Sequence, residues 1–499
     1  MLKFSATVLA IALLSASAVV QETHNHAVPE QLGKVSFPTT CSPAVQAQFE
    51  RAVALLHSFA YSAAEAAFRQ IGEKDPHCAM AHWGVAMSYF HQLWDPPLAT
   101  STFGLGRGEI ERAQEMGARS ERERGFIDAL GVIYANEDTT SYPKRIQSYL
   151  QAMQKLAAAN PRDVESQVFY ALALLAAASP GDRSHANQKR AVQVLQPLYA
   201  KYPQHPGMAH YLIHACDNSE MARDGLPAAL AYAKIAPSAP HALHMPSHIF
   251  TRLGMWDDSI SSNLAAQAAA HRQGDTGEEL HAMDYLVYAY LQNGNDGAAA
   301  QVIQELKSMP DLKPTDAKVG YAATAMPVRY AVERKQWAEA AAIMPPPPSA
   351  PPQVIAVAVW ARGLGLARSG NPDAARTQAA VLQDLEQKLR KSSRDYWAVQ
   401  VAVQRLEVLA WASQAEGKSD DAAALLRQAA DTEDAVEKLP VTPGPIVPAR
   451  EQLGDLLLQT NRPQMALTEF QVALKNAPGR RGATMGAARA AQLSAVAEN

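Results

Sequence analysis

The chain has 499 residues with a formal net charge of −4 and a sequence pI near 6.4, and no run of lysine or arginine stands out, which excludes a surface for nucleic acid or anionic membrane. Alanine is abundant and the alternating Val, Ile and Thr pattern of strands is scarce, so an all-α fold is predicted. The length exceeds what one compact core usually organises, which favours several domains or an extended array.

The N-terminus has the layout of a secretory signal peptide. MLKFSATVLAIALLSASAVV combines Lys3, a short apolar stretch and the small-residue pattern that ends at Ala18, and we expect cleavage there. The stretch is shorter than the ~20 residues of a membrane helix, and no later segment is long and apolar enough to span a bilayer. We therefore predict a signal peptide over 1–18, an extended tail over 19–40 that carries His24 and His26, and an exported protein, periplasmic or secreted, without a membrane span.

The stretch AHWGVAMSYFHQLW, which ends at Trp94, offers Trp83 and His91 as candidate groove residues. Aromatic residues at helical spacing are more often packed in a core, and that alternative stays open. The region 100–205 shows no clear repeat register.

Histidines concentrate in the middle of the chain: of 15, 8 lie between His205 and His281, and none follows. At about 100° per residue, His210, His214 and Asp217 share one helix face. His241, His244 and His248 share another. Each histidine alone is more often a hydrogen-bonded structural residue than a ligand, and repeat duplication would also copy such a pattern. Pro246 either bends this second helix or marks a later helix start.

A proline run, MPPPPSAPP at 344–352, cannot be helical and is predicted to be extended. It divides a histidine-bearing N-terminal array, 41–343, from a histidine-free C-terminal array, 353–488.

The stretch PAREQLGDLLLQTNRPQMALTEFQVALKNAP, which ends at Pro478, shows a repeat most clearly. Small residues at Gly454, Ala466 and Ala473, together with Phe470, resemble the tetratricopeptide repeat, a 34-residue helix-turn-helix unit. Related units recur upstream, for example at Ala52, Ala64, Phe68, Ile71 and Pro76, and at Leu286, Tyr290, Gly294 and Ala299. The resemblance implies a right-handed superhelical solenoid of stacked helical hairpins.

In repeat coordinates His210 and His244 take position 5, and His214 and His248 take position 9. The resemblance implies that these positions line one concave groove. The candidate site set is His210, His214, Asp217, His241, His244, His248, His281 and Asp284. Imidazole with carboxylate suits a divalent transition metal such as Zn, Cu, Fe or Ni.

The same layout places Cys41 and Cys78 at one end of the first hairpin, where export permits a disulfide. Two free thiols are the alternative. Cys216 is expected to be a small buried residue.

The resemblance implies an exported scaffold or adaptor that binds a protein or peptide partner in its groove. A metal-binding or metal-dependent protein is the alternative. The spacing matches no named catalytic motif, so no reaction is assigned, and the oligomeric state stays open.

Overall fold

The computed structural model describes residues 30–93, 100–135 and 141–497. It separates the chain into two units, 1–30 and 31–499, and every described helix lies in the second. The predicted signal peptide, His24, His26 and Trp94 lie outside the described residues.

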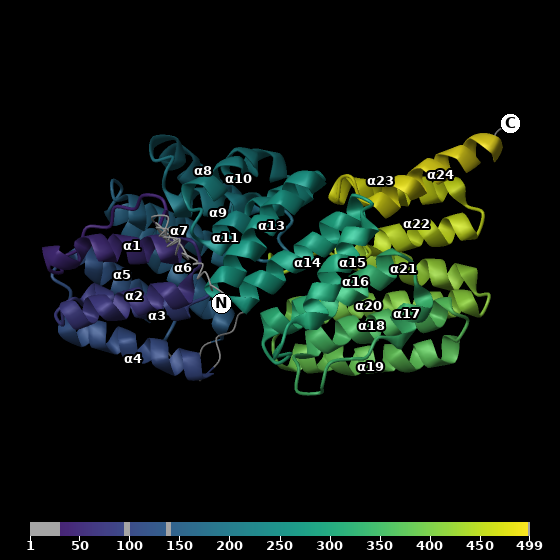
Figure 1. The fold of residues 1–499 in the computed structure, drawn as a ribbon, viewed down its shortest axis with the longest axis horizontal. Helices are drawn as coiled ribbons and strands as arrows, with labels where there is room; N and C mark the ends of the chain where they lie inside the picture. Colours follow the sequence, from purple (N-terminus) through teal and green to yellow (C-terminus); the bar gives the residue numbers. More distant parts are fainter. Residues whose placement is uncertain (1–29, 94–99, 136–140, 498–499) are drawn as a thin grey trace, which may run out of the picture. The chain divides into compact units, whose positions relative to one another are not determined.

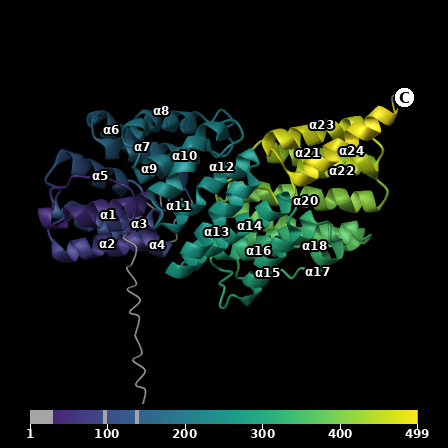
Figure 2. The same cartoon turned by 45° about the horizontal axis from the view of Figure 1, so that its top comes forward.

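The second unit is built from helical hairpins. Its described residues form α-helices and one short 3-10 turn, and none of them forms a strand. Successive helices pack against one another, as Figures 1 and 2 show, and the predicted all-α array of helix-turn-helix repeats is confirmed. The helices are η1 Pro43–Val45, α1 Gln46–His57, α2 Tyr61–Lys74, α3 Ala79–Tyr89, α4 Thr100–Met116, α5 Glu121–Gly131, α6 Tyr142–Ala159, α7 Val164–Ala176, α8 Ala186–Lys201, α9 Pro206–Cys216, α10 Ala222–Ile235, α11 Pro240–His244, α12 Pro246–Leu253, α13 Trp256–Gln273, α14 Thr276–Gln292, α15 Asp296–Ser308, α16 Ala317–Glu333, α17 Trp337–Ala342, α18 Pro352–Arg368, α19 Pro372–Lys391, α20 Asp395–Ala415, α21 Ser419–Asp434, α22 Ala449–Gln459, α23 Pro463–Asn476 and α24 Arg481–Ala497.

Small residues sit where neighbouring helices cross, both within a hairpin and between consecutive hairpins. A Cβ added to Gly84 on α3 would lie 2.3 Å from the Phe68 ring on α2. One added to Gly454 on α22 would lie 2.7 Å from the Phe470 ring on α23. Only glycine permits these close approaches, which explains the repeat pattern in physical terms.

The proline segment breaks the helices but not the hydrophobic core. Residues 343–351 are non-helical, and Pro352 begins α18. One cluster of buried side chains nevertheless extends from Tyr321 on α16 to Ala490 on α24. A larger cluster extends from Leu32 to Phe250.

The extended residues 31–40 are attached to the helical body. The Lys34 amide donates to the Gln204 carbonyl at 2.8 Å, and Phe37 is fully buried. Of the two alternatives left open for Cys41 and Cys78, the structure has the disulfide. Cys216 is free and buried, and burial raises the pKa of its thiol to about 12.

The loop between α21 and α22, residues 435–448, crosses to helices far earlier in the chain. Its Glu437 amide donates to the Pro180 carbonyl at 2.7 Å, and its Thr442 carbonyl accepts from the Tyr285 hydroxyl at 3.1 Å. We call it the 435–448 loop. It brings the C-terminal half of the sequence against the histidine-bearing helices.

Within the described ranges, no helix combines the length and apolar character that a membrane crossing requires.

Candidate functional site: a buried histidine cluster

Four of the helices between α9 and α14 bring the predicted histidines together. His210 and His214 lie on α9, His241 and His244 on α11, His248 on α12 and His281 on α14. The helix is interrupted at Pro246: α11 ends at His244 and α12 begins at Pro246. Pro246 therefore begins a new helical segment, and Met245 between the two segments keeps right-handed helical angles (φ −53°, ψ −34°).

The six histidines form two adjoining triads. In the His214 triad (His210, His214, His241), each residue offers a ring nitrogen within 4.8 Å of the other two. The His248 triad (His244, His248, His281) has the same spacing. The ring centroids of His214 and His248 are 6.0 Å apart, and those of His241 and His244 are 6.1 Å apart, so the triads form one continuous cluster.

The cluster is enclosed, whereas the repeat pattern predicted side chains that line an open groove. Five of its histidines are at most 2% exposed, and His214 alone is partly exposed. Two features cover it. Phe59 packs on the His214 triad, and the 435–448 loop reaches Asp217 and Tyr285.

A second layer of acceptors orients four of the rings through their Nδ1 atoms. His210 Nδ1 lies 2.6 Å from the His57 carbonyl oxygen, and His244 Nδ1 lies 2.6 Å from Asn263 Oδ1. Because Asn263 Nδ2 donates to the Ser259 carbonyl at 2.7 Å, the oxygen of this amide is the atom that faces His244.

The other two rings face carboxylates. His248 Nδ1 lies 2.9 Å from Asp217 Oδ2, and His241 Nδ1 lies 3.2 Å from Glu278 Oε2. Burial raises the pKa of each carboxyl, but nearby cations have the larger, opposite effect. These cations are Lys438 and Arg252 at Asp217 and Lys318 at Glu278. Both carboxyl pKa values therefore lie well below the usual range. Both groups are therefore carboxylates and can only accept.

All four acceptors require a proton on Nδ1, so each neutral ring presents an Nε2 lone pair. His244 Nε2 and His248 Nε2 lie 3.0 Å apart. Two lone pairs at this distance repel, unless a proton or a cation lies between them. His210 Nε2 and His214 Nε2 are buried and have no hydrogen-bond partner in the described part of the chain.

The interior keeps five of the six imidazoles neutral. Burial and the neighbouring histidines lower the pKa values of His210, His214, His244 and His281 well below the usual histidine value. Burial lowers the pKa of His248 to about 4, although Asp217 acts in the opposite direction. Neutral imidazole is the form that binds a metal.

Asp217 and Asp284, the two candidate carboxylates, are held by cations. Asp217 accepts from Arg252 at 2.9 Å and from Lys438 at 2.8 Å, in addition to His248. Asp284 faces the buried guanidinium of Arg329 at 3.4 Å. Neither belongs to a triad, so Asp217 is a positioning group for His248 and Asp284 forms a buried ion pair.

One aromatic residue packs against each triad. The Phe59 ring lies 4.4 to 5.7 Å from the three rings of the His214 triad, and its backbone is left-handed with φ 52°. Such a conformation is rare for a bulky residue and is maintained only where the surroundings fix it. The Tyr285 ring lies 4.7 to 5.3 Å from the rings of the His248 triad.

A further histidine pair lies behind the cluster. His57 Nε2 and His205 Nε2 each lie 2.9 Å from an oxygen of the buried Glu165. His57 Nδ1 contacts the Tyr211 hydroxyl at 2.9 Å, and His205 Nδ1 accepts from the Met208 amide. All these ring nitrogens are engaged, so we interpret this group as structural.

A cavity of about 330 Å³ reaches the His214 triad through His214 itself. It is lined by Leu93, Leu175, Tyr396, Trp397 and Leu439 among others.

Trp83 and His91, the other groove candidates from the sequence, play no part in the triads. Trp83 is a core residue packed on Phe37, and His91 stacks on Tyr61 with ring centroids 4.2 Å apart.

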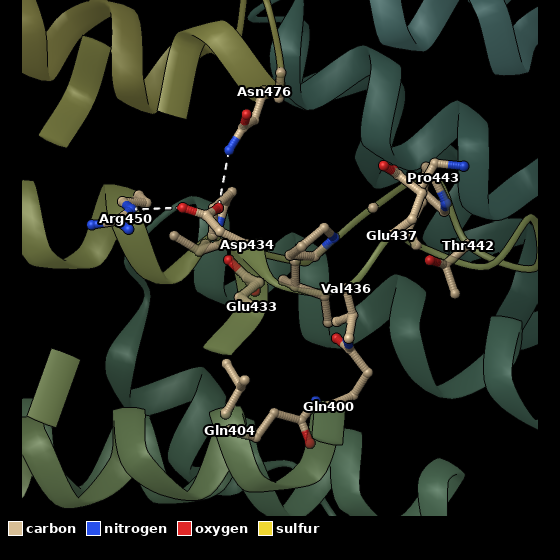
Figure 3. A pocket seen from close by; sticks show the side chains of 18 of the residues that line it. Gln400, Gln404, Glu433, Asp434, Val436, Glu437, Thr442, Pro443, Arg450 and Asn476 are labelled. Atoms are coloured by element: carbon tan, nitrogen blue, oxygen red, sulfur yellow. Dashed lines mark hydrogen bonds and ion pairs between the residues drawn. The ribbon is translucent and has the colours of Figure 1, made fainter. Parts of the chain in front are cut away.

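A second cavity lies beside α20 and the 435–448 loop (Figure 3). Gln400 and Gln404 line one wall. Across from them, Asp434 accepts from Arg450 at 2.8 Å and from Asn476 at 3.0 Å. Its lining is mixed, with polar, charged and aromatic side chains.

Repeat reasoning did not find the residues around the triads, chiefly Phe59, Asn263, Glu278 and Tyr285. Phe59 lies in the turn after α1, and Asn263 lies on α13, outside the groove positions. The sequence carries one weak signal for these residues: Tyr285 is the residue directly after the candidate Asp284, on the histidine-bearing helix α14.

Comparisons with known proteins add little to this picture. No family model and no curated protein matches the chain. Among solved structures, the Cut9-Hcn1 hetero-tetramer of the APC/C covers 92% of this chain and 79% of its own at 12% identity and TM-score 0.36. Yeast Tom70 covers 90% and 88% at 11% identity and TM-score 0.33. The human IFIT1 dimer with m7Gppp-AAAA covers 84% and 90% at 11% identity and TM-score 0.37. These scores are low, so the likeness transfers no binding property to this chain.

Proposed function

We propose that this protein binds a transition metal in the buried histidine cluster. One observation carries the proposal: the His244 and His248 Nε2 atoms face each other at 3.0 Å while both Nδ1 atoms face acceptors. A cation bound by both nitrogens would remove the repulsion. Backbone carbonyl and carboxylate partners on the remote nitrogen are also the usual second layer around metal-binding histidines.

The donor set indicates the class of metal. Neutral imidazoles without an available carboxylate suit Zn, Cu, Ni or Fe rather than Mg or Ca. Nitrogens bound to one ion by bonds of about 2.1 Å are at most about 4.2 Å apart. The ring nitrogens of each triad lie within 4.8 Å of one another, so small ring rotations would let all three bind one ion. The geometry favours no particular reaction.

The test is elemental analysis by mass spectrometry of untagged protein purified without chelator. We expect stoichiometric metal in the native chain and its loss in a His210→Ala, His214→Ala, His244→Ala, His248→Ala variant. A His77→Ala, His271→Ala variant is the control, because both histidines are exposed. Metal-free native protein that also binds no added Zn²⁺, Cu²⁺ or Ni²⁺ would refute the proposal.

Export from the cytoplasm is part of the proposal. The Cys41–Cys78 disulfide supports it, because disulfides persist mainly in oxidising compartments. Cell fractionation tests it: mature protein that begins after Ala18 is expected outside the cytoplasm, and full-length cytoplasmic protein would contradict it.

A protein-binding scaffold is the second candidate, and the cavity of Figure 3 supports it. Its mixture of Trp397, glutamines and paired charges offers both apolar contacts and hydrogen bonds to an extended peptide. A peptide library tests this idea. A bound peptide should lose affinity when Gln404→Trp fills the cavity, and unchanged affinity would place any partner elsewhere.

A further inference from the structure

We infer that the cluster holds two metal ions, one in each triad, and that the ion of the His214 triad binds a small ligand from the adjoining cavity. This inference rests on the proposed metal binding. It adds the number of ions, the difference between them and the class of ligand.

The count of ions follows from the spacing of the nitrogens. Three nitrogens within 4.8 Å of one another occur twice, and each triad is complete without a member of the other. The six imidazoles therefore provide two separate sets of three nitrogen ligands, and three protein ligands leave at least one coordination position for another donor.

The two positions differ in access. His214 lines the cavity of about 330 Å³, whereas no residue of the His248 triad lines any of the described cavities. The His248 triad is closed by Tyr285 and by Asn263, both in contact with its rings. An external donor can therefore reach the first ion and not the second.

The lining of the cavity indicates the ligand. Leu93, Leu175 and Leu439 supply apolar surface, and Trp397 and Tyr396 supply aromatic surface. The charged side chains of the cavity are of both signs, with Lys438 in contact with Asp217 at 2.8 Å and with Arg394, Asp395 and Glu437 also in the lining. These features fit a small uncharged molecule with an apolar or aromatic body and one nitrogen or oxygen donor directed at the metal.

The first measurement counts ions in full-length protein reconstituted with Co²⁺. We expect two equivalents in the native chain and one equivalent in each of two double variants. The first variant carries His210→Ala with His214→Ala, and the second carries His244→Ala with His281→Ala. Circular dichroism melting shows that each variant is folded. One equivalent in the native chain overturns the inference while leaving metal binding intact. No metal at all defeats the proposed function instead.

The second measurement titrates imidazole into the Co²⁺ protein and follows the visible absorption. We expect a saturable change that survives in the His244→Ala, His281→Ala variant and is lost in the His210→Ala, His214→Ala variant. Ala178→Trp, at the cavity wall, should keep two ions but weaken imidazole at least tenfold. Ala158→Trp, on the exposed face of α6, is the control. Equal imidazole affinity in Ala178→Trp and the control overturns the ligand position.

Discussion

The two triads share a ligand type and spacing but differ in what surrounds them. Each triad has two rings held by Nδ1 acceptors, and in the His248 triad these acceptors are the side chains of Asp217 and Asn263. The Tyr285 hydroxyl continues from this triad to the 435–448 loop. The His214 triad is covered by the apolar ring of Phe59 and borders a cavity at His214. The same histidine pattern, repeated after 34 residues, thus gives one closed and one open site, and the surroundings rather than the ligands make the difference.

The largest expected effect comes from removing the polar support of the His248 triad. Asp217→Asn leaves Lys438 and Arg252 without their shared carboxylate in a buried setting, and we expect a loss of about 3–5 kcal/mol in the free energy of unfolding. Urea denaturation measures it, with the exposed Asp224→Asn as control. A loss below about 1 kcal/mol would show that these charges are solvated.

On the His214 side, Phe59→Ala should destabilise the protein by about 3 kcal/mol, because a buried aromatic ring is lost. The same variant opens the wall of that triad alone. When Phe59→Ala is added to the His210→Ala, His214→Ala variant, the metal content of the remaining His248 triad should be unchanged. If that content also falls, the triads are mechanically coupled and the contrast between them is weaker than the contacts suggest.

A smaller effect is expected from Asn263→Ala, which removes the acceptor of His244 Nδ1. We expect metal affinity at the His248 triad to fall about 10- to 100-fold, as second-layer substitutions usually do, with the His214 triad unaffected. Competition with a chelator of known affinity measures both. An equal fall at both triads would contradict the separate support described above.

The smallest effect should follow Tyr285→Phe, which removes one hydroxyl that donates to the Thr442 carbonyl. We expect a loss of about 1 kcal/mol in unfolding free energy and no change in the ring packing on the His248 triad. Thermal unfolding with and without metal provides the measurement. A loss of metal would instead assign the hydroxyl a direct role at the ion.

The repeat pattern predicted the helices outside 100–205 and the convergence of all six histidines, because a 34-residue period returns each position to the same face of the stack. It could not predict the enclosure. Phe59 reaches the cluster through a left-handed turn, and the 435–448 loop reaches it from a distant part of the chain; neither has a periodic signature. Asp284 occupies the same repeat position as His210 and His244, yet it pairs with Arg329 from the next helical layer. Periodicity reports the face of a helix and not the partner that faces it.

The bond between Lys438 and Asp217 joins residues 221 positions apart, which has a consequence for biosynthesis. The histidine-bearing helices emerge from the ribosome long before the segment that closes over them. We therefore expect the nascent chain to leave the side of the cluster at Asp217 and Tyr285 uncovered until synthesis is nearly complete. The order of the chain thus sets a late time at which any captured ion becomes trapped, and a chain truncated before residue 435 should exchange its metal faster than the full chain.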